Sequence, residues 1–182
     1  RMSAYTATCA AAGTRVLVAA ESSFSSATSE LLLNGHRTIE LLDKRLADVD
    51  VAPLAVAMAE AKKFDAVDLS YNDLGAGAAD SLATLLKSDA VITSLDLSQN
   101  SMSEESIQGL CEALKANGTI RALSLSGNAI GGSGGMAVAE MLQVNSGLES
   151  LSLSNCGLNT ESLVALATVL RDNTRLVALD VS

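Results

Sequence analysis

The chain has 182 residues, enough for one domain or one short array of repeats. Hydrophobic residues make up 48% of it but aromatic residues only 2%, so leucine, alanine and valine must build its core. The net charge is −9 and no basic run is present, which argues against nucleic-acid binding, because that requires a basic surface to neutralise phosphates. No stretch approaches the roughly 20 apolar residues that cross a bilayer, so direct membrane insertion is not expected.

The first 29 residues precede any periodic pattern and are predicted to form an extended arm. They carry Arg1 and Arg15, are rich in Ala, Ser and Thr, and have no acidic residue before Glu21. This composition is typical of organelle transit peptides, so residues 1–29 are interpreted either as the remnant of one or as a partner-binding segment.

His36, the only histidine, follows this arm in the segment "NGHR", which is expected to be a loop. It has no second histidine or nearby cysteine with which to bind a metal. The three cysteines, Cys9, Cys111 and Cys156, are odd in number and form no CxxC pair, which argues against a disulfide framework and a zinc site. This favours a reducing, intracellular setting, with cytoplasm, cilium, mitochondrion and plastid all left open.

From residue 39 onward, apolar residues recur every 28 residues without insertion or deletion. The main column comprises Ile39, Val67, Leu95, Leu123, Leu151 and Leu179. Such a register predicts a solenoid over residues 30–182, because one unit cannot bury its apolar face without stacked neighbours. Within it we expect a degenerate first repeat at 36–63, regular repeats over 64–174 and an incomplete last repeat at 175–182.

Each period changes its pattern halfway. The stretch "ITSLDLSQNSM" alternates apolar and polar residues, as a strand with one buried face does. The following "EESIQGLCEALKANG" places Ile107, Leu110, Cys111 and Leu114 at helical spacing, which predicts an amphipathic helix. Each unit is therefore predicted to be strand, turn, helix and return loop.

This pattern resembles the leucine-rich repeat family, and its length resembles the ribonuclease-inhibitor-like class. The motif L-x-x-L-x-L-x-x-N/C-x-L is met by "ITSLDLSQNSM", "IRALSLSGNAI" and "LESLSLSNCGL". The resemblance covers residues 64–182, whereas Lys44 and Asp50 depart from the asparagine and small-residue columns, as suits a terminal repeat that tolerates polar residues. It implies an α/β horseshoe arc with a parallel concave sheet and convex helices.

The resemblance also assigns a structural role to one polar column. In the family this column points into the solenoid and satisfies backbone groups in the turn after the strand. Here it contains Asn72, Asn100, Asn128 and Cys156. A thiol is a weaker donor than an amide, so Cys156 is interpreted as a structural variant rather than a reactive site.

Two segments that resemble chemical sites have simpler explanations. The glycine-rich run at residues 130–136, "IGGSGGM", lacks the Lys-Ser/Thr that a phosphate-binding loop requires, and Gly134 falls in the small-residue column. Glu104 and Glu105 stand at a helix start, where the helix dipole favours negative charge. No catalytic residue, metal or cofactor is predicted, and the chain is not expected to be an enzyme.

Side chains on the inner curve are expected to be small or acidic. The acidic positions Asp68, Asp96 and Asp180 are candidate partner-binding residues, and they favour a basic partner surface at the concave face. Tyr71, beside the first complete strand, is the aromatic candidate.

The outer helices supply two further candidates. One of their columns becomes apolar toward the C-terminal end, where it contains Met136 and Val164.

Taken together, these features favour a non-catalytic protein–protein interaction scaffold that binds other protein subunits. It would be an accessory structural subunit of an organellar complex or of a cilium or axoneme. The alternative is a regulatory leucine-rich-repeat protein of the GTPase-activating or ribonuclease-inhibitor type.

Overall fold

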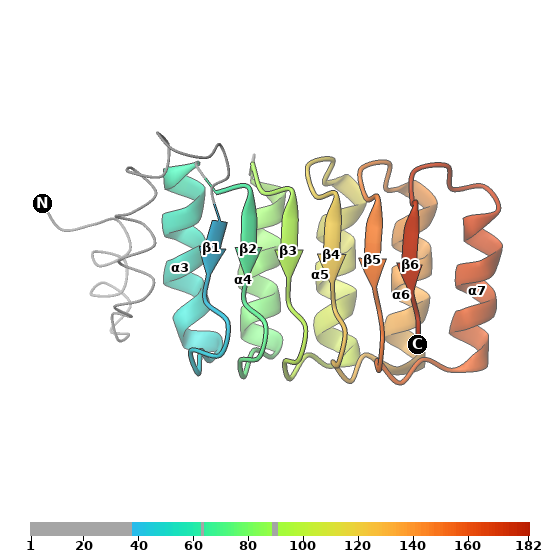
Figure 1. Ribbon diagram of the computed structural model, residues 1–182, viewed down its shortest axis with the longest axis horizontal. Coiled ribbons are helices and arrows are strands. Elements are labelled where there is room, and N and C mark those ends of the chain that lie inside the picture. Colours follow the sequence, from blue (N-terminus) through green and yellow to red (C-terminus); the bar gives the residue numbers. More distant parts are fainter. Residues whose placement is uncertain (1–37, 63, 89–90) are drawn as a thin grey trace, which may run out of the picture.

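A computed structural model describes residues 38–62, 64–88 and 91–182 (Figure 1). The expected arm at 1–29, His36 and Cys9 lie outside the described residues. Within them, strands and helices alternate strictly along the chain: β1 (Thr38–Glu40), α3 (Asp48–Ala61), β2 (Ala66–Asp68), α4 (Ala76–Lys87), β3 (Ser94–Asp96), α5 (Glu104–Ala116), β4 (Ala122–Ser124), α6 (Gly131–Val144), β5 (Ser150–Ser152), α7 (Thr160–Leu170) and β6 (Ala178–Asp180).

The six described strands form one parallel sheet in sequential order, β1 to β6. Every residue of a strand lies opposite the residue 28 positions later, as Leu95 does to Leu123. One period of 28 residues therefore corresponds to one step from a strand to its neighbour in the sheet. The predicted α/β solenoid with a parallel sheet is confirmed, although each strand spans only three residues.

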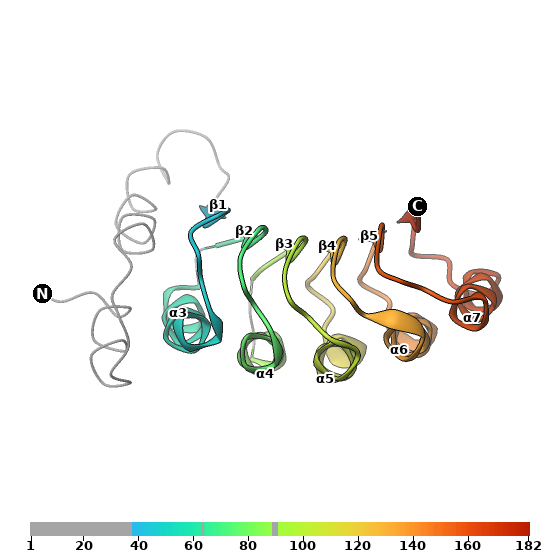
Figure 2. The ribbon, with the colours of Figure 1, turned by 90° about the horizontal axis from the view of Figure 1, so that it is seen from below.

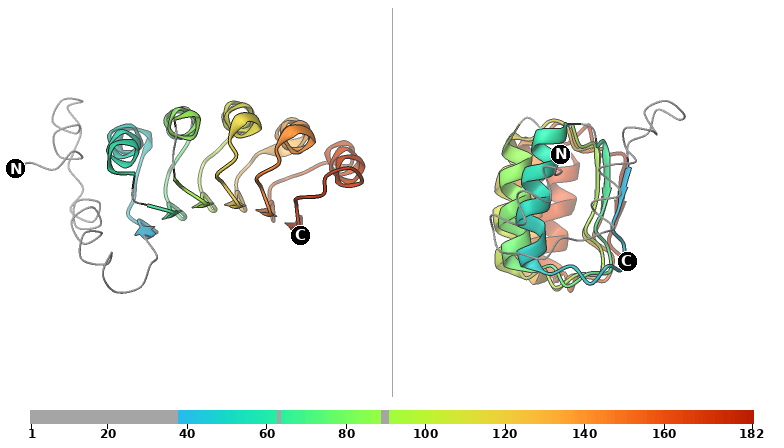
Figure 3. Two further views of the ribbon diagram at one scale, coloured as in Figure 1. Left: turned by 90° about the horizontal axis from the view of Figure 1, so that it is seen from above. Right: turned by 90° about the vertical axis from the view of Figure 1, so that its left-hand side faces the viewer.

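The stack curves, with the sheet on the inner side and the helices on the outer side (Figures 2 and 3). Neighbouring strands are about 4.8 Å apart, whereas packed helices need about 8–10 Å between their axes. The row of helices is therefore longer than the row of strands, and the array bends around its sheet. This fixes the concave face as a surface of strand side chains.

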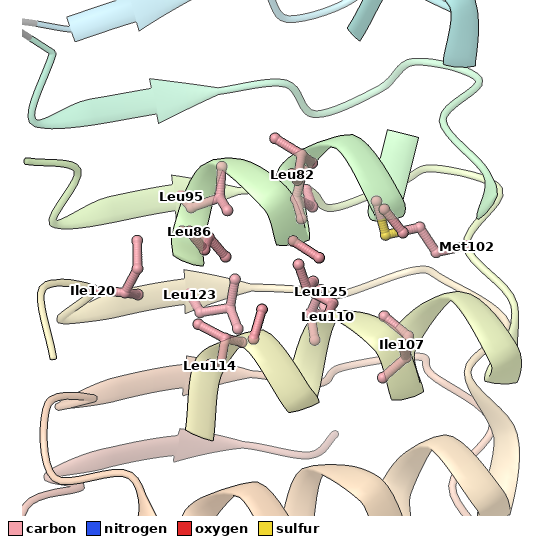
Figure 4. Packing of buried hydrophobic residues seen from close by; sticks show 14 of the residues in the cluster. Leu82, Leu86, Leu95, Met102, Ile107, Leu110, Leu114, Ile120, Leu123 and Leu125 are labelled. Carbon is pink, nitrogen blue, oxygen red and sulfur yellow. The ribbon is translucent and has the colours of Figure 1, made fainter. Parts of the chain in front are cut away.

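The core is continuous from repeat to repeat (Figure 4). Leu95 and Leu123 of the strands belong to the same buried cluster as Leu110 and Leu114 of α5, and all four are at most 3% exposed. Burial weakens at β6, where Leu179 is only partly buried and Val181 is 43% exposed, because no described element lies beyond that strand.

Two helices are capped by residues of their own repeat. The Ser103 hydroxyl accepts a long hydrogen bond from the Ser106 N–H at the start of α5 (3.5 Å). The Asn159 side chain accepts the Ser162 N–H at the start of α7 (2.9 Å). Both arrangements satisfy N–H groups that have no partner within the helix.

At the starts of α4 and α6, an acidic side chain of the preceding repeat lies against the backbone. Asp48 accepts the N–H groups of Gly75 (2.6 Å) and Gly77 (2.9 Å) at the start of α4. At the start of α6, Glu104 lies so close to Gly131 that a Cβ there would be 2.0 Å from its Oε1 atom. Glycine in "IGGSGGM" thus makes room for neighbouring repeats.

The first repeat departs from the pattern for a reason that differs from the sequence-based interpretation. Asp50 is not a polar residue tolerated at an end: it is 5% exposed, and its carboxylate accepts the N–H of Ala47 at the start of α3 (3.1 Å). Lys44 is exposed, and its backbone N–H donates to Asn72 of the next repeat (3.1 Å).

Candidate protein-interaction surfaces

The asparagine column lies inside the turns that follow the strands. Asn128, which is 1% exposed, donates through Nδ2 to the carbonyls of Leu97 (2.9 Å) and Leu125 (2.8 Å). Its Oδ1 accepts the Met102 N–H of the preceding repeat (3.1 Å). Asn100 and Asn72 make the equivalent contacts one and two repeats earlier. Each amide therefore links two neighbouring turns.

Cys156 keeps the donor part of this role. Its thiol lies 3.3 Å from the Leu125 carbonyl and 3.6 Å from that of Ser154. Backbone hydrogen bonds from Asn128 and Gly127 also reach its sulfur, although burial has the larger effect on its pKa. The Ile130 N–H, which occupies the position of Met102 one repeat later, bonds to the Asn128 carbonyl instead (2.9 Å). A small local turn thus replaces the missing acceptor.

Both described cysteines are buried thiols without a disulfide partner. Burial raises the pKa of Cys111 to about 12, and burial also raises the pKa of Cys156. Since the thiolate is the nucleophile, a thiol of this kind is unreactive near neutral pH. Both lie in the packed interior rather than on a surface that a substrate could reach.

In a Cys9→Ser background, we expect a thiol reagent at pH 8 to leave both remaining cysteines unmodified until denaturant is added. With a pKa of about 12, only roughly one Cys111 in ten thousand is a thiolate at that pH. The pKa of Cys111 in the folded chain lies above its ordinary value of 9.0, so the contribution of the neutral thiol to stability is complete below about pH 9 and declines toward pH 12. Modification of the native chain at the rate of an exposed thiol would contradict this.

A second asparagine column, which the sequence interpretation missed, closes the helical side of the stack. Asn145 donates to the carbonyls of Leu114 (2.6 Å) and Asn117 (2.9 Å) and accepts the N–H groups of the loop after α6. Asn117 and Asn173 do the same in the adjacent repeats. The signal was present, because these three residues share the 28-residue spacing.

The acidic candidates lie on the concave face. Asp68 and Asp96 stand opposite one another on β2 and β3, with Glu40 of β1 in the same row. Asp68 and Asp96 each accept the N–H and hydroxyl of the serine two residues later, at 2.6–2.9 Å. Asp180, on β6, is separated from them by Ser124 and Ser152 of β4 and β5.

The Asp180 carboxylate is also held by hydrogen bonds. It accepts the N–H of Ser182 (3.1 Å) and the hydroxyl of Ser152 (3.2 Å). Led by the bond from the Ser182 backbone, these donors lower the pKa of Asp180 below its usual range.

Tyr71 lies in the turn directly after β2, is 57% exposed and has a φ of 55°. Equivalent turns hold Asp43, Gln99, Gly127 and Asn155, all with positive φ. Glycine and asparagine suit this left-handed conformation, whereas a bulky residue is strained in it.

Met136 and Val164 lie on the opposite side, on the outer faces of α6 and α7, and are 41% and 60% exposed. Met136 lines a groove of about 550 Å³ between α5 and α6, together with Gln108, Glu112, Ser133, Ala137 and Glu140. The structure does not bring these two residues together with Tyr71 and the acidic row. They belong to a separate surface.

The described part of the chain contains neither a metal-binding cluster nor a membrane-spanning helix. No group of three or more His, Cys, Asp or Glu residues there is arranged to hold a metal ion. No helix there is long and apolar enough to cross a membrane.

The fold and its internal asparagines define a solenoid repeat protein. A family model described as Leucine Rich repeat matches residues 116–139 and 144–167. No curated protein sequence gives a significant match. Residues 116–139 and 144–167 are leucine-rich repeats, which confirms that resemblance there; the ribonuclease-inhibitor-like class stays a prediction.

Solved structures share the fold. The leiomodin-1 domain described as actin-binding site 2 has a TM-score of 0.69 at 18% identity, over 87% of this chain and 91% of that one. The tropomodulin C-terminal domain of Caenorhabditis elegans has a TM-score of 0.66 at 15% identity, over 85% of this chain and 92% of that one.

Proposed function

We propose that this chain is a non-catalytic protein–protein interaction scaffold and an accessory structural subunit of a larger intracellular assembly. The observation that carries the proposal is that its potentially reactive polar groups are buried, whereas the side chains on the concave face are exposed. Both described thiols are buried and the asparagine amides lie inside the turns, whereas the exposed concave side chains stand on regularly paired strands. A rigid face without a reactive group suits binding better than catalysis.

The comparison structures support a binding role of this kind. The leiomodin-1 domain with this fold is an actin-binding site, so the fold serves protein recognition in that protein. An organellar complex, a cilium or an axoneme is the proposed setting here. Residues 1–29 are proposed to lie along a neighbouring subunit as a partner-binding arm.

A regulatory role is the second candidate, favoured by the acidic concave face. Inhibition of a basic ribonuclease would suit the net charge of −9. Stimulation of a GTPase would require charged residues at the strand ends, where this chain has mainly serine: Ser70, Ser98, Ser126 and Ser154. A salt-dependent ribonuclease titration and a GTPase assay separate these two activities.

The test of the scaffold role is the native mass of the chain in a gentle extract of its source, by size-exclusion chromatography with mass-spectrometric detection. Co-elution with one large, defined complex is the expected result, and deletion of residues 1–29 should weaken it. Elution of the full chain at its own mass of 18.6 kDa would contradict the accessory-subunit proposal.

A further inference from the structure

Charged residues beside the sheet and on it differ in how they are balanced. Glu149, just before β5, lies 2.9 Å from an Arg175 nitrogen and 3.9 Å from one of Arg121. On the concave face, neither Asp180 of β6 nor the row of Glu40, Asp68 and Asp96 makes an ion pair with any described residue, and the row places three acidic residues on adjacent strands. The cation that would compensate this row is not supplied by the described chain.

The geometry of the row makes this imbalance costly. Glu40, Asp68 and Asp96 are directly opposite one another on β1, β2 and β3, and neighbouring parallel strands are about 4.8 Å apart. Like charges in directly opposed positions destabilise a sheet. The serine hydroxyls beside Asp68 and Asp96 stabilise each carboxylate locally but bring no positive charge.

Two large side chains border the row, and both interrupt the repeat. Leu42, which is 45% exposed, occupies a column that is serine in the next five repeats: Ser70, Ser98, Ser126, Ser154 and Ser182. Tyr71 occupies the neighbouring left-handed column, where Gly127 and Asn155 are the unstrained choices. The Ser70 hydroxyl lies 2.6 Å from Asp68, so the Leu42 column shares a face with the acidic row.

Packing among the described residues explains neither departure. An exposed leucine contributes little to the core, and a tyrosine at positive φ costs the fold energy. Apolar and aromatic side chains beside a row of charges are what a protein-binding surface requires, with the anchors giving affinity and the charges giving orientation.

We propose that the N-terminal concave face, formed by Glu40, Leu42, Asp68, Tyr71 and Asp96, binds a Lys/Arg-rich amphipathic segment of a partner protein. The segment lies across the strands. Helical residues four apart are about 5–6 Å from one another at Cβ, which matches the spacing of the carboxylates. Its cations pair with the acidic row, and an apolar side chain at one end contacts Leu42 and Tyr71. This deepens the proposed scaffold role and rests on it.

The probe is a fluorescent synthetic helical peptide with lysines four residues apart on one face and a leucine at one end. We expect the full chain to bind it, measured by anisotropy at low salt, and to release it as salt rises. The double variant Asp68→Asn/Asp96→Asn should bind it roughly five- to tenfold more weakly, since each exposed ion pair contributes a few-fold. Asparagine retains an oxygen that accepts the serine donors, so the fold is kept.

The matched control is Asp80→Asn/Glu105→Gln, which removes the same charge from exposed positions on α4 and α5. Its affinity for the peptide should equal that of the unmodified chain. An equal loss in both double variants would show that binding depends on net charge alone, and no loss in either would show that the acidic row is not used. Either result would overturn the proposal.

Tyr71→Asn gives an independent readout, because asparagine occupies the same column at Asn155. We expect its urea midpoint to rise, since the strained backbone is relieved, while peptide affinity falls about threefold. An unchanged affinity would make Tyr71 merely structural and would remove it from the site.

These outcomes are separable from those of the scaffold proposal. A chain that elutes in a large complex and yet binds the peptide independently of Asp68, Tyr71 and Asp96 would retain the scaffold role and lose this surface. A chain that elutes alone but shows the variant pattern would retain the surface and lose the accessory-subunit role.

Discussion

Replacement of Asn128 by alanine is expected to destabilise the folded chain by about 3 kcal/mol, because a buried polar group that loses its partner costs roughly 1–3 kcal/mol. The amide has three backbone partners in two repeats, at Leu97, Met102 and Leu125. The site is 1% exposed, so water cannot replace the amide without opening the turn. Urea unfolding followed by circular dichroism measures the change.

Two further variants show whether hydrogen bonding is the cause. Asn128→Cys should lose about half as much as the alanine variant, because the thiol of Cys156 already donates to the equivalent carbonyl in the next repeat. Gln143→Ala, at an exposed position on α6, should change stability by less than about 0.5 kcal/mol. An Asn128→Ala variant as stable as Gln143→Ala would show that the asparagine column is dispensable.

Leu123→Ala is expected to cost about 3 kcal/mol, whereas Leu179→Ala should cost less than about 1 kcal/mol. Both leucines occupy the same column, the central residue of a strand, and are 56 residues apart. Leu123 is 3% exposed between two neighbouring repeats, while Leu179 of β6 is only partly buried. Truncation leaves a cavity in the first case and removes a half-solvated side chain in the second.

The pair tests the nearest-neighbour character of the stack. In a solenoid each repeat contacts only the adjacent repeats, so identical substitutions should differ by the number of neighbours that cover them. Thermal or urea unfolding of the two variants provides the comparison. Equal losses would indicate that the β6 end is covered as tightly as the middle of the stack.

Much of the architecture could be predicted because the sequence repeats the pattern of each structural unit several times. The recurrence from Ile39 to Leu179 fixes strand position, register and helix face at once, since a side chain buried in one unit must be buried in all of them. The turn asparagines follow the same rule. Asn117, Asn145 and Asn173 could have been predicted from their spacing, although they were not.

Other features could not be read from the pattern, because they depend on contacts between different columns. Asp48 caps a helix that begins nearly a full repeat later, and the glycines near Gly131 make room for Glu104. Asp50 departs from its column because it caps its own helix, which no spacing indicates.

The candidate site divides in the same way. The sequence alone identified Asp68, Asp96 and Tyr71 as candidates, and its periodicity determined the solenoid and its inner strands. Only the tertiary structure showed that Glu40 is paired with Asp68 on adjacent strands, that Leu42 is exposed beside this row, and that Tyr71 is held at positive φ. The physical reason is that periodicity describes what repeats share. Exposure, charge balance and backbone strain arise where one repeat differs from its neighbours, and these depend on which side chains the stack brings together.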